Sequence, residues 1–220
     1  MIGVVLRNGS TTEVDASAAA SLILGRAYYV HYYDALPAGD LSSLSILDLA
    51  FPAFLGAVPQ FRRVLSPHGA LRLQEVMDHA STCLANIPSE VRLSDWPDTP
   101  ANRTSLVNLI SATTGGAAGP LHGFGPACCT KMLHKKRPLL IPIVDNWQMS
   151  AWGKPTTWTP GRIVDVIFMI REHVSRQIDE LELISRRVHE HDTTSPQLSA
   201  IRVYDILFWE MSRVLDEFGP

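Results

Sequence analysis

An apolar stripe in the second half of the chain constrains the fold more than any other feature of the sequence. Between Arg162 and Glu190 it recurs at steps of three and four, through Ile163, Val166, Ile167, Ile170, Val174, Ile178, Leu181, Ile184 and Val188. This spacing places the apolar side chains on one face of a helix, whereas a half-buried strand would alternate. We therefore expect one long amphipathic helix over 162–190.

Similar patterns organise the rest of the chain. We expect a short strand at Ile2–Leu6, closed by a turn at Asn8-Gly9, and helices at Asp15–Tyr33, Leu41–Ala50, Ala70–Ile87, Thr104–Thr113 and Gln197–Glu217. Asp15 or Ser17 could cap the first helix, and Pro52 should end or kink the second. Residues 96–103 and 191–196 are expected loops. The predicted fold class is all-α, a two-lobed helical bundle with a short N-terminal β segment, in a single domain over 1–220.

Composition narrows the class of protein. Of 220 residues, 46% are hydrophobic and 19% charged, which is typical of a globular chain. The longest apolar runs contain prolines and fall short of the roughly 20 residues that cross a bilayer. The first residues lack the pattern of a secretory signal, so we expect a cytoplasmic protein. We also expect a monomer. A net charge of −3 argues against a generally basic nucleic-acid binder, so any DNA contact must be local.

One segment, Leu121–Asp145, combines a tight turn, a basic helix and an acidic residue. Leu-x-Gly-Phe-Gly predicts a hairpin whose two glycines accept positive φ, and Pro126 then begins a helix. Backbone amides at a helix N-terminus bind phosphate. We expect one phosphate track along the hairpin and this helix, contacting Gly123, Phe124, Gly125, Ala127, Thr130, Lys131, Lys135, Lys136 and Arg137.

Each part of this segment also has a purely structural interpretation. The glycines could simply join two helices, the Lys/Arg run could be a solvated helix C-terminus, and Asp145 could be an N-cap. The continuation favours a functional site, because the apolar, proline-stiffened connection over 138–144 delivers Asp145 to a fixed position.

In this order, the elements resemble the helix-hairpin-helix DNA glycosylase superfamily, which includes endonuclease III, the adenine mismatch glycosylase and the alkylpurine glycosylases. Residues 130–145 also resemble an uncharacterised bacterial family with a Lys-Leu-Leu-x-x-Lys-Arg-Pro-x-Leu-Ile-Pro-x-x-Asp core. The resemblance is confined to residues 121–145. It implies that Asp145 is the catalytic carboxylate, which would stabilise the oxocarbenium-like sugar and orient the attacking water.

The resemblance also carries expectations about lyase activity and cofactors. Superfamily members that cut the strand have a Schiff-base lysine two residues beyond the second hairpin glycine, where this chain has Ala127. A monofunctional enzyme that leaves an abasic site is therefore expected, although Lys131, one turn away, stays open as a displaced lyase lysine. No cysteine follows Cys129, so the four-cysteine iron–sulfur cluster of some relatives cannot form. We expect no cofactor and no catalytic metal; a structural monovalent cation at the hairpin stays open.

A glycosylase must hold its flipped base between aromatic or apolar groups. The candidate walls of such a base pocket are Tyr28, Tyr29, Tyr32, Tyr33, Asp34 and Trp147, with Asp48, Trp152 and Trp158 as weaker candidates. The alternative for the tyrosines is a core or lobe interface. Cys128 and Cys129 are expected to be small packed residues of the hairpin helix.

The leading hypothesis is a DNA glycosylase that acts on double-stranded DNA and is nucleoid-associated when bound. It would remove a modified base, in repair or in defence against phage with modified DNA. One alternative is a non-catalytic helix-hairpin-helix DNA-binding protein, and another is an interaction protein whose basic run meets an acidic partner. A decisive observation is whether Asp145 faces an open aromatic-lined pocket or is consumed by local amides.

Overall fold

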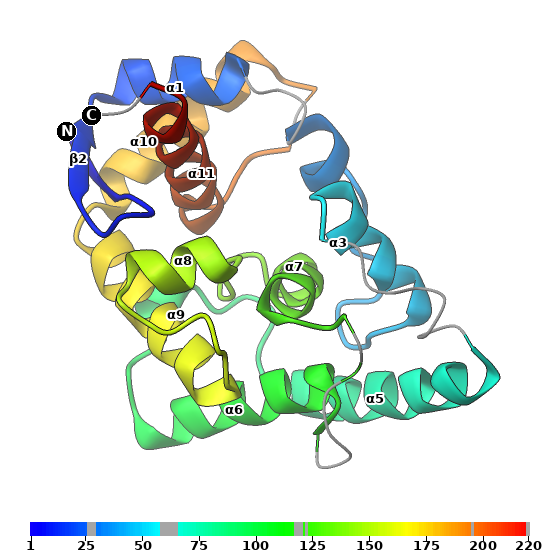
Figure 1. The fold of residues 1–220 in the computed structure, drawn as a ribbon. Helices are drawn as coiled ribbons and strands as arrows, with labels where there is room; N and C mark the ends of the chain where they lie inside the picture. The colour runs from blue at the N-terminus through cyan, green and yellow to red at the C-terminus, as the bar shows by residue number, and fades with distance from the viewer. Residues whose placement is uncertain (26–29, 58–65, 117–120, 122, 195, 219–220) are drawn as a thin grey trace.

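The computed structural model is mostly helical and carries one small sheet (Figure 1). It describes residues 1–25, 30–57, 66–116, 121, 123–194 and 196–218. Strand β1 (Ile2–Val5) pairs antiparallel with β2 (Thr11–Val14), with Ile2 opposite Val14. The α-helices are α1 (Ala16–Gly25), α3 (Ala50–Phe54), α5 (Pro67–Ala85), α6 (Pro100–Thr114), α7 (Pro126–Lys136), α8 (Asn146–Ala151), α9 (Pro160–Ser175), α10 (Ile178–His191) and α11 (Ala200–Phe218). The predicted all-α fold with a short N-terminal β segment is confirmed.

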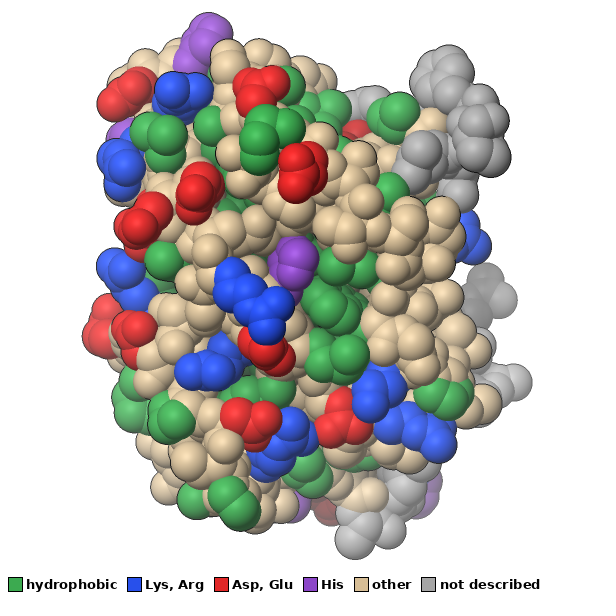
Figure 2. All heavy atoms as spheres, turned by 90° about the vertical axis from the view of Figure 1, so that its left-hand side faces the viewer, with side chains coloured by type: hydrophobic (Ala, Val, Ile, Leu, Met, Phe, Trp, Pro, Cys, Tyr) green, Lys and Arg blue, Asp and Glu red, His purple; other side chains and the backbone are tan. Residues whose placement is uncertain are grey.

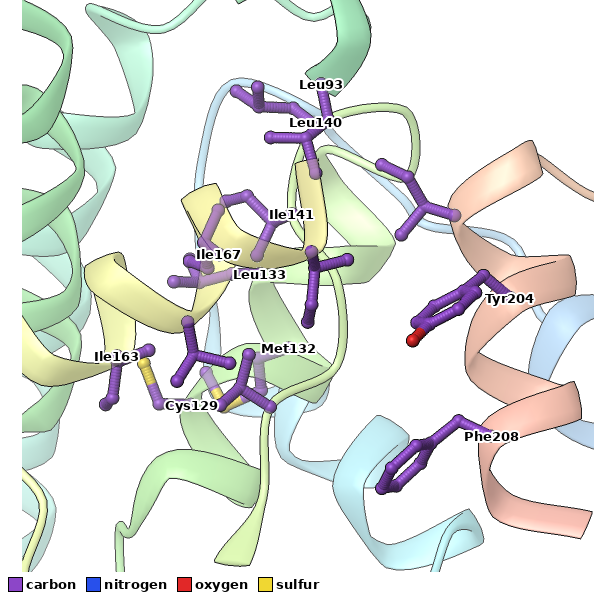
Figure 3. Close-up of a cluster of buried hydrophobic side chains, with 14 of the residues drawn as sticks. Leu93, Cys129, Met132, Leu133, Leu140, Ile141, Ile163, Ile167, Tyr204 and Phe208 are labelled. Atoms are coloured by element: carbon purple, nitrogen blue, oxygen red, sulfur yellow. The ribbon is translucent and has the colours of Figure 1, made fainter. Parts of the chain in front are cut away.

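Helix α7 lies near the middle of the molecule (Figure 1). In that view α5 and α6 lie below it, α3 lies to its right, and α1, α10 and α11 lie above with the sheet. Figure 3 shows the apolar side chains that join α7 to α9 and α11, among them Met132, Ile167 and Phe208. These side chains belong to one continuous core, which makes α7 an interior element. No helix in the described ranges is long and apolar enough to span a membrane.

The expected single helix at 162–190 is two helices. Helix α9 ends at Ser175 and α10 begins at Ile178, because Gln177 leaves the helical path at φ −138° and ψ 29°. Its side-chain amide pairs with the backbone of Gly3 in β1: Oε1 accepts from Gly3 N and Nε2 donates to Gly3 O, both at 3.0 Å. The apolar stripe continues across the break, so its period could not reveal where the helix ends.

We expect Gln177→Ala to lower the free energy of unfolding by about 1–2 kcal/mol, because it removes the two hydrogen bonds that the Gln177 side chain makes to β1. Urea unfolding measures this loss. The matched control is Gln74→Ala on α5, whose exposed amide donates to Asp78 and whose removal should cost no more than about 0.5 kcal/mol. Equal losses in the two variants would contradict the prediction.

Two other predicted boundaries also differ from the structure. In place of a helix at 41–50 there is a short 3-10 turn, Ile46–Leu49, followed by α3. Pro52 lies in the first turn of α3, where its missing N–H is not needed, and does not end the helix. Helix α6 begins at Pro100 rather than at 104, because the Thr99 hydroxyl accepts from Asn102 N at 3.3 Å and places the proline at the first helical position.

Candidate functional site

Leu121 and Phe124 close a tight turn shortly before α7 begins. Leu121 N donates to Thr114 O at 2.9 Å, and Phe124 N donates to Leu121 O at 3.0 Å. Gly123 has φ +82°, a conformation that suits glycine, but Gly125 has φ −85° and is the N-cap of α7. Only one of the two predicted glycines therefore requires the left-handed region. The Phe124 ring is buried beneath the turn, so its side chain anchors the hairpin and is not available to DNA.

Asp145 is held by the first turn of α8. Its Oδ1 accepts from Trp147 N at 2.8 Å and from Gln148 N at 2.9 Å, so the structural interpretation of Asp145 as an N-cap is correct. Val144, the residue before Asp145, is held by Thr130 on α7, whose hydroxyl accepts from Val144 N at 2.9 Å. Thr130 is fully buried and is not a DNA contact. The other oxygen of Asp145, Oδ2, has no hydrogen bond to any residue that the structure describes.

An open pocket of about 470 Å³ lies beside Asp145. Its walls come from the end of α3, the hairpin, and helices α7, α8 and α11. It is lined by Leu55, Gly56, Ala57, Gly123, Gly125, Pro126, Ala127, Cys128, Lys131, Asp145, Asn146, Trp147 and Trp209. Trp147 and Trp209 stack with ring centroids 4.4 Å apart, and the guanidinium of Arg7 lies 4.4 Å from the Trp147 ring. Asp145 thus both caps α8 and borders an aromatic-walled pocket.

Burial sets the electrostatics of this pocket. It raises the pKa of Asp145, while the Gln148 amide, the Lys131 charge and the Trp147 amide oppose that rise. Burial also lowers the pKa of Lys131, and the charges of Asp145 and Asp205 oppose that fall. Lys131 Nζ donates to Leu55 O at 2.8 Å. Lys131 therefore stabilises the ionised form of Asp145 from a fixed position.

The basic run at the end of α7 is buried, which corrects the prediction of a DNA-facing cationic cluster. The side chains of Lys131, Lys135, Lys136 and Arg137 are each at most 8% exposed. The last three donate, at 2.7–3.2 Å, to main-chain carbonyls of segments that wrap the helix, those of Tyr33, Asp34, Ala38, Asp40, Leu41, Leu84 and Ile87. Lys135, Lys136 and Arg137 thus hold segments of the chain around α7 and are not exposed as a cationic surface.

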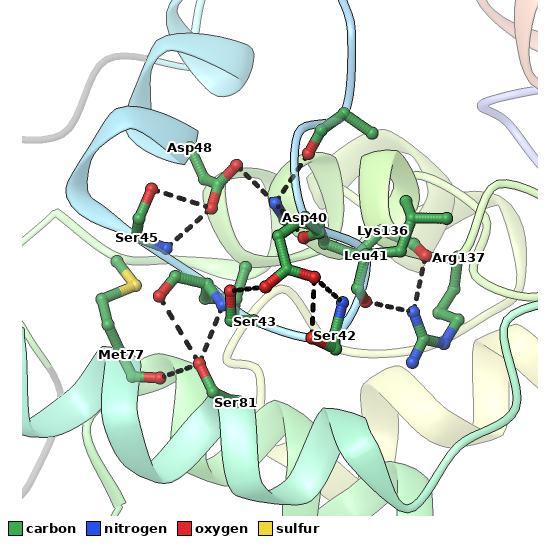
Figure 4. A network of polar contacts seen from close by, with 12 residues as sticks. Asp40, Leu41, Ser42, Ser43, Ser45, Asp48, Met77, Ser81, Lys136 and Arg137 are labelled. Atoms are coloured by element: carbon green, nitrogen blue, oxygen red, sulfur yellow. Dashed lines mark hydrogen bonds and ion pairs between the residues drawn. The ribbon is translucent and has the colours of Figure 1, made fainter.

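Figure 4 shows one part of this arrangement. Lys136 Nζ forms a buried ion pair with Asp48 Oδ1 at 2.9 Å. The other oxygen of Asp48 accepts from Ser45 N at 2.7 Å, which completes a capping box at the 3-10 turn. Asp48, a weaker candidate for the base pocket, is therefore a structural partner of α7.

Of the aromatic residues predicted to line a base pocket, only some lie at the pocket beside Asp145. Trp147 lines it, but Tyr33 is completely buried, and its hydroxyl donates to Lys131 O at 2.8 Å. Tyr32 is 55% exposed and does not line the pocket. The Asp34 carboxylate is bound by a guanidinium of α11, and Trp152 and Trp158 do not line the pocket either. Tyr28 and Tyr29 lie outside the described residues.

Sequence reasoning missed the polar residues of α11. Arg202 donates through Nε to Asp34 at 2.9 Å and through NH1 to Asp205, and all three side chains are largely buried. Arg202, Asp205 and Trp209 border a second cavity of about 70 Å³, next to the pocket. The signal was present, because Arg202 and Asp205 are one helical turn apart in the otherwise apolar run 201–208. Such a pair on a buried helix indicates an internal ion pair.

Three further findings concern the cysteines, metal-binding side chains and the surface charge. Burial raises the pKa of Cys128 to about 12 and raises that of Cys129 as well, which fits packed thiols and not nucleophiles. Within the described ranges, no group of three or more His, Cys, Asp or Glu side chains could hold a metal ion. On the face shown in Figure 2, Lys and Arg side chains are interspersed with Asp and Glu and do not gather into a basic patch.

Fold and site together define a mostly helical protein with a carboxylate pocket behind a helix-joining hairpin. A family model described as "Family of unknown function (DUF6308)" matches residues 19–212, and the chain belongs to this family. The matched range contains Gly123, Gly125, Asp145, Arg202 and Asp205. No curated protein and no solved structure matches the chain.

Proposed function

We propose that this protein is a DNA glycosylase that hydrolyses the N-glycosidic bond of a base flipped into the pocket beside Asp145. The observation that supports the proposal is the double position of Asp145, which caps α8 through Oδ1 and borders a tryptophan-walled pocket. Two backbone amides fix the orientation of the carboxylate, and Oδ2 is left for a substrate or a water molecule.

The reaction would use the pocket in three ways. Trp147 and Trp209, which stack on each other, form an aromatic wall against which an extruded base can pack. As the bond from the sugar C1′ to the base nitrogen breaks, the bonding electrons leave with the base and positive charge develops on the sugar, which the Asp145 carboxylate stabilises. Water then adds to C1′ and loses its proton to Asp145; the departed base takes up a proton from solvent, and Asp145 returns its proton to solvent. The products are a free base and an abasic site.

The buried cations of α7 change how this protein would hold DNA. The phosphate contacts left to the hairpin segment are the backbone amides of Gly123, Gly125 and Ala127, at or just before the start of α7. The amine of Lys131 is engaged by Leu55 O, which favours base removal without strand cutting. DNA affinity should therefore fall less steeply with salt than it would if four α7 cations also touched phosphates.

The proposal is tested with Asp145→Asn, in which the amide oxygen can still cap α8. We expect base release to fall by about a hundredfold or more, because the carboxylate charge is lost while binding to an abasic duplex is retained. Release is measured by mass analysis of free bases after incubation with genomic DNAs of differing modification.

The matched control is Asp15→Asn, which changes an exposed cap that also accepts from two amides, those of Ser17 and Ala18. This variant should release base at the wild-type rate. Undiminished release by Asp145→Asn would overturn the catalytic assignment. A wild-type protein that binds DNA but frees no base from any substrate would instead favour the non-catalytic DNA-binding alternative.

A further inference from the structure

The 70 Å³ cavity behind the pocket, here called the inner chamber, is bordered by charged side chains of α7 and α11. Leu55, Lys131 and Trp209 line both the inner chamber and the larger pocket. The chamber therefore adjoins the tryptophan wall against which a base would stack. Because a single water occupies about 30 Å³ of liquid volume, a space of this size admits the edge or a substituent of a ring and not a whole base.

Asp205 lines the inner chamber and has a carboxylate oxygen that accepts no hydrogen bond from the described residues. Its side chain is buried, and Oδ2 accepts from Arg202 NH1. Its Oδ1 is buried as well and has no hydrogen-bond partner within the described residues. A buried carboxylate oxygen without a donor is costly, and native structures keep few of them without a reason.

Two cationic side chains line the inner chamber with Asp205, and each is engaged with another acceptor. Arg202 Nε donates to Asp34 at 2.9 Å, Arg202 NH2 lies 2.9 Å from Asp34 Oδ2 without a hydrogen bond, and Lys131 Nζ donates to Leu55 O at 2.8 Å. Because no described residue donates to Asp205 Oδ1, we expect a bound ligand to supply its partner. An acceptor calls for a donor, so the chemistry favours an N–H group over a phosphate or a carboxylate.

We propose that the inner chamber is the specificity site for the excised base, in which Asp205 Oδ1 accepts a hydrogen bond from an amino or ring N–H group. That the ligand is an excised base rests on the proposed function. The unpaired, buried oxygen of Asp205 is an observation that does not depend on that function. The ligand class is a nitrogen heterocycle with a donor edge. A heterocycle of the same shape without that donor is rejected, because it leaves the carboxylate oxygen buried and unpaired.

Two ring probes of matched shape test the proposal. In 2-aminopyridine an amino group lies beside a ring nitrogen, and 2-methylpyridine replaces that amino group with a methyl. We expect calorimetry to show that the wild type binds 2-aminopyridine at least about tenfold more tightly than 2-methylpyridine. Asp205→Asn should lose most of this preference, whereas Asp15→Asn, at an exposed cap, should keep it.

A measurement on the wild type covers the case in which Asp205→Asn does not fold. Titration with 2-aminopyridine should move the side-chain carboxyl ¹³C resonance of Asp205, and titration with 2-methylpyridine should not. Equal binding of the two probes, no binding of either, or a stationary Asp205 resonance would overturn the proposal. A protein that binds 2-aminopyridine through Asp205 but frees no base from DNA would contradict the proposed function alone and leave the site standing.

Discussion

Replacing Lys136 with methionine is expected to lower the free energy of unfolding by about 3–5 kcal/mol. The Lys136 amine is 2.9 Å from Asp48 Oδ1 and donates to the carbonyls of Ala38 and Asp40 at 2.7 and 2.9 Å. Methionine fills the same space but leaves the Asp48 charge buried without its cation. Urea unfolding followed by circular dichroism measures the loss.

The matched control is Lys154→Met, which breaks an ion pair of another kind. Lys154 Nζ lies 3.2 Å from Asp165, but the two side chains are 29% and 38% exposed, so we expect a loss below about 1 kcal/mol. Adding Asp48→Asn to Lys136→Met should recover part of the stability, because no uncompensated charge then remains. A loss of stability in Lys136→Met as small as that of Lys154→Met would contradict the prediction that the buried Asp48 charge depends on Lys136.

The α7 cations show why part of the fold could not be predicted from the sequence. Lysine and arginine are almost never fully buried, so a Lys-Lys-Arg run at a helix end indicates a solvated surface. Here the carbonyls that bind Lys135, Lys136 and Arg137 come from segments about 50 to 100 residues earlier in the chain. Only the folded arrangement brings those segments around α7, so no local pattern could show that the run is internal.

Local sequence patterns predicted those elements whose structure depends mainly on neighbouring residues. Apolar periodicity predicted helical structure over α5, α11 and the region of α9 and α10, which it joined into one helix, because these helices bury an apolar face against the core. The N-cap threonine before Pro100 marked the start of α6 and was overlooked. At the site, Asp145 and Trp147 could be named because they directly follow the apolar connection that leads on from the hairpin and α7. Asp205 and Trp209 lie about 60 residues further along the chain and reach the pocket only through packing of α11.

The second large effect is expected at Arg202, whose guanidinium bridges Asp34 and Asp205 in the interior. Arg202→Met leaves two buried carboxylates without a cation, and we expect it to lower the free energy of unfolding by about 3–5 kcal/mol at neutral pH. The matched control is Arg92→Met, because the Arg92–Glu182 pair is exposed and should contribute less than about 1 kcal/mol. Similar losses in both variants would contradict the prediction.

The pH dependence of Arg202→Met separates lost charge pairing from lost packing. Burial and the Asp145 charge raise the pKa of Asp205 from 3.8 to about 6, against the lowering effect of Arg202. A carboxyl whose pKa is higher in the folded state favours folding below its unfolded pKa, and this contribution is lost as pH rises through the folded pKa. In the wild type this loss falls between about pH 4 and 6. Without Arg202 the pKa of Asp205 rises further, so the deficit of the variant should shrink in acid and grow toward neutral pH. A deficit that stays constant from acid to neutral pH would assign the effect to packing of the arginine stem.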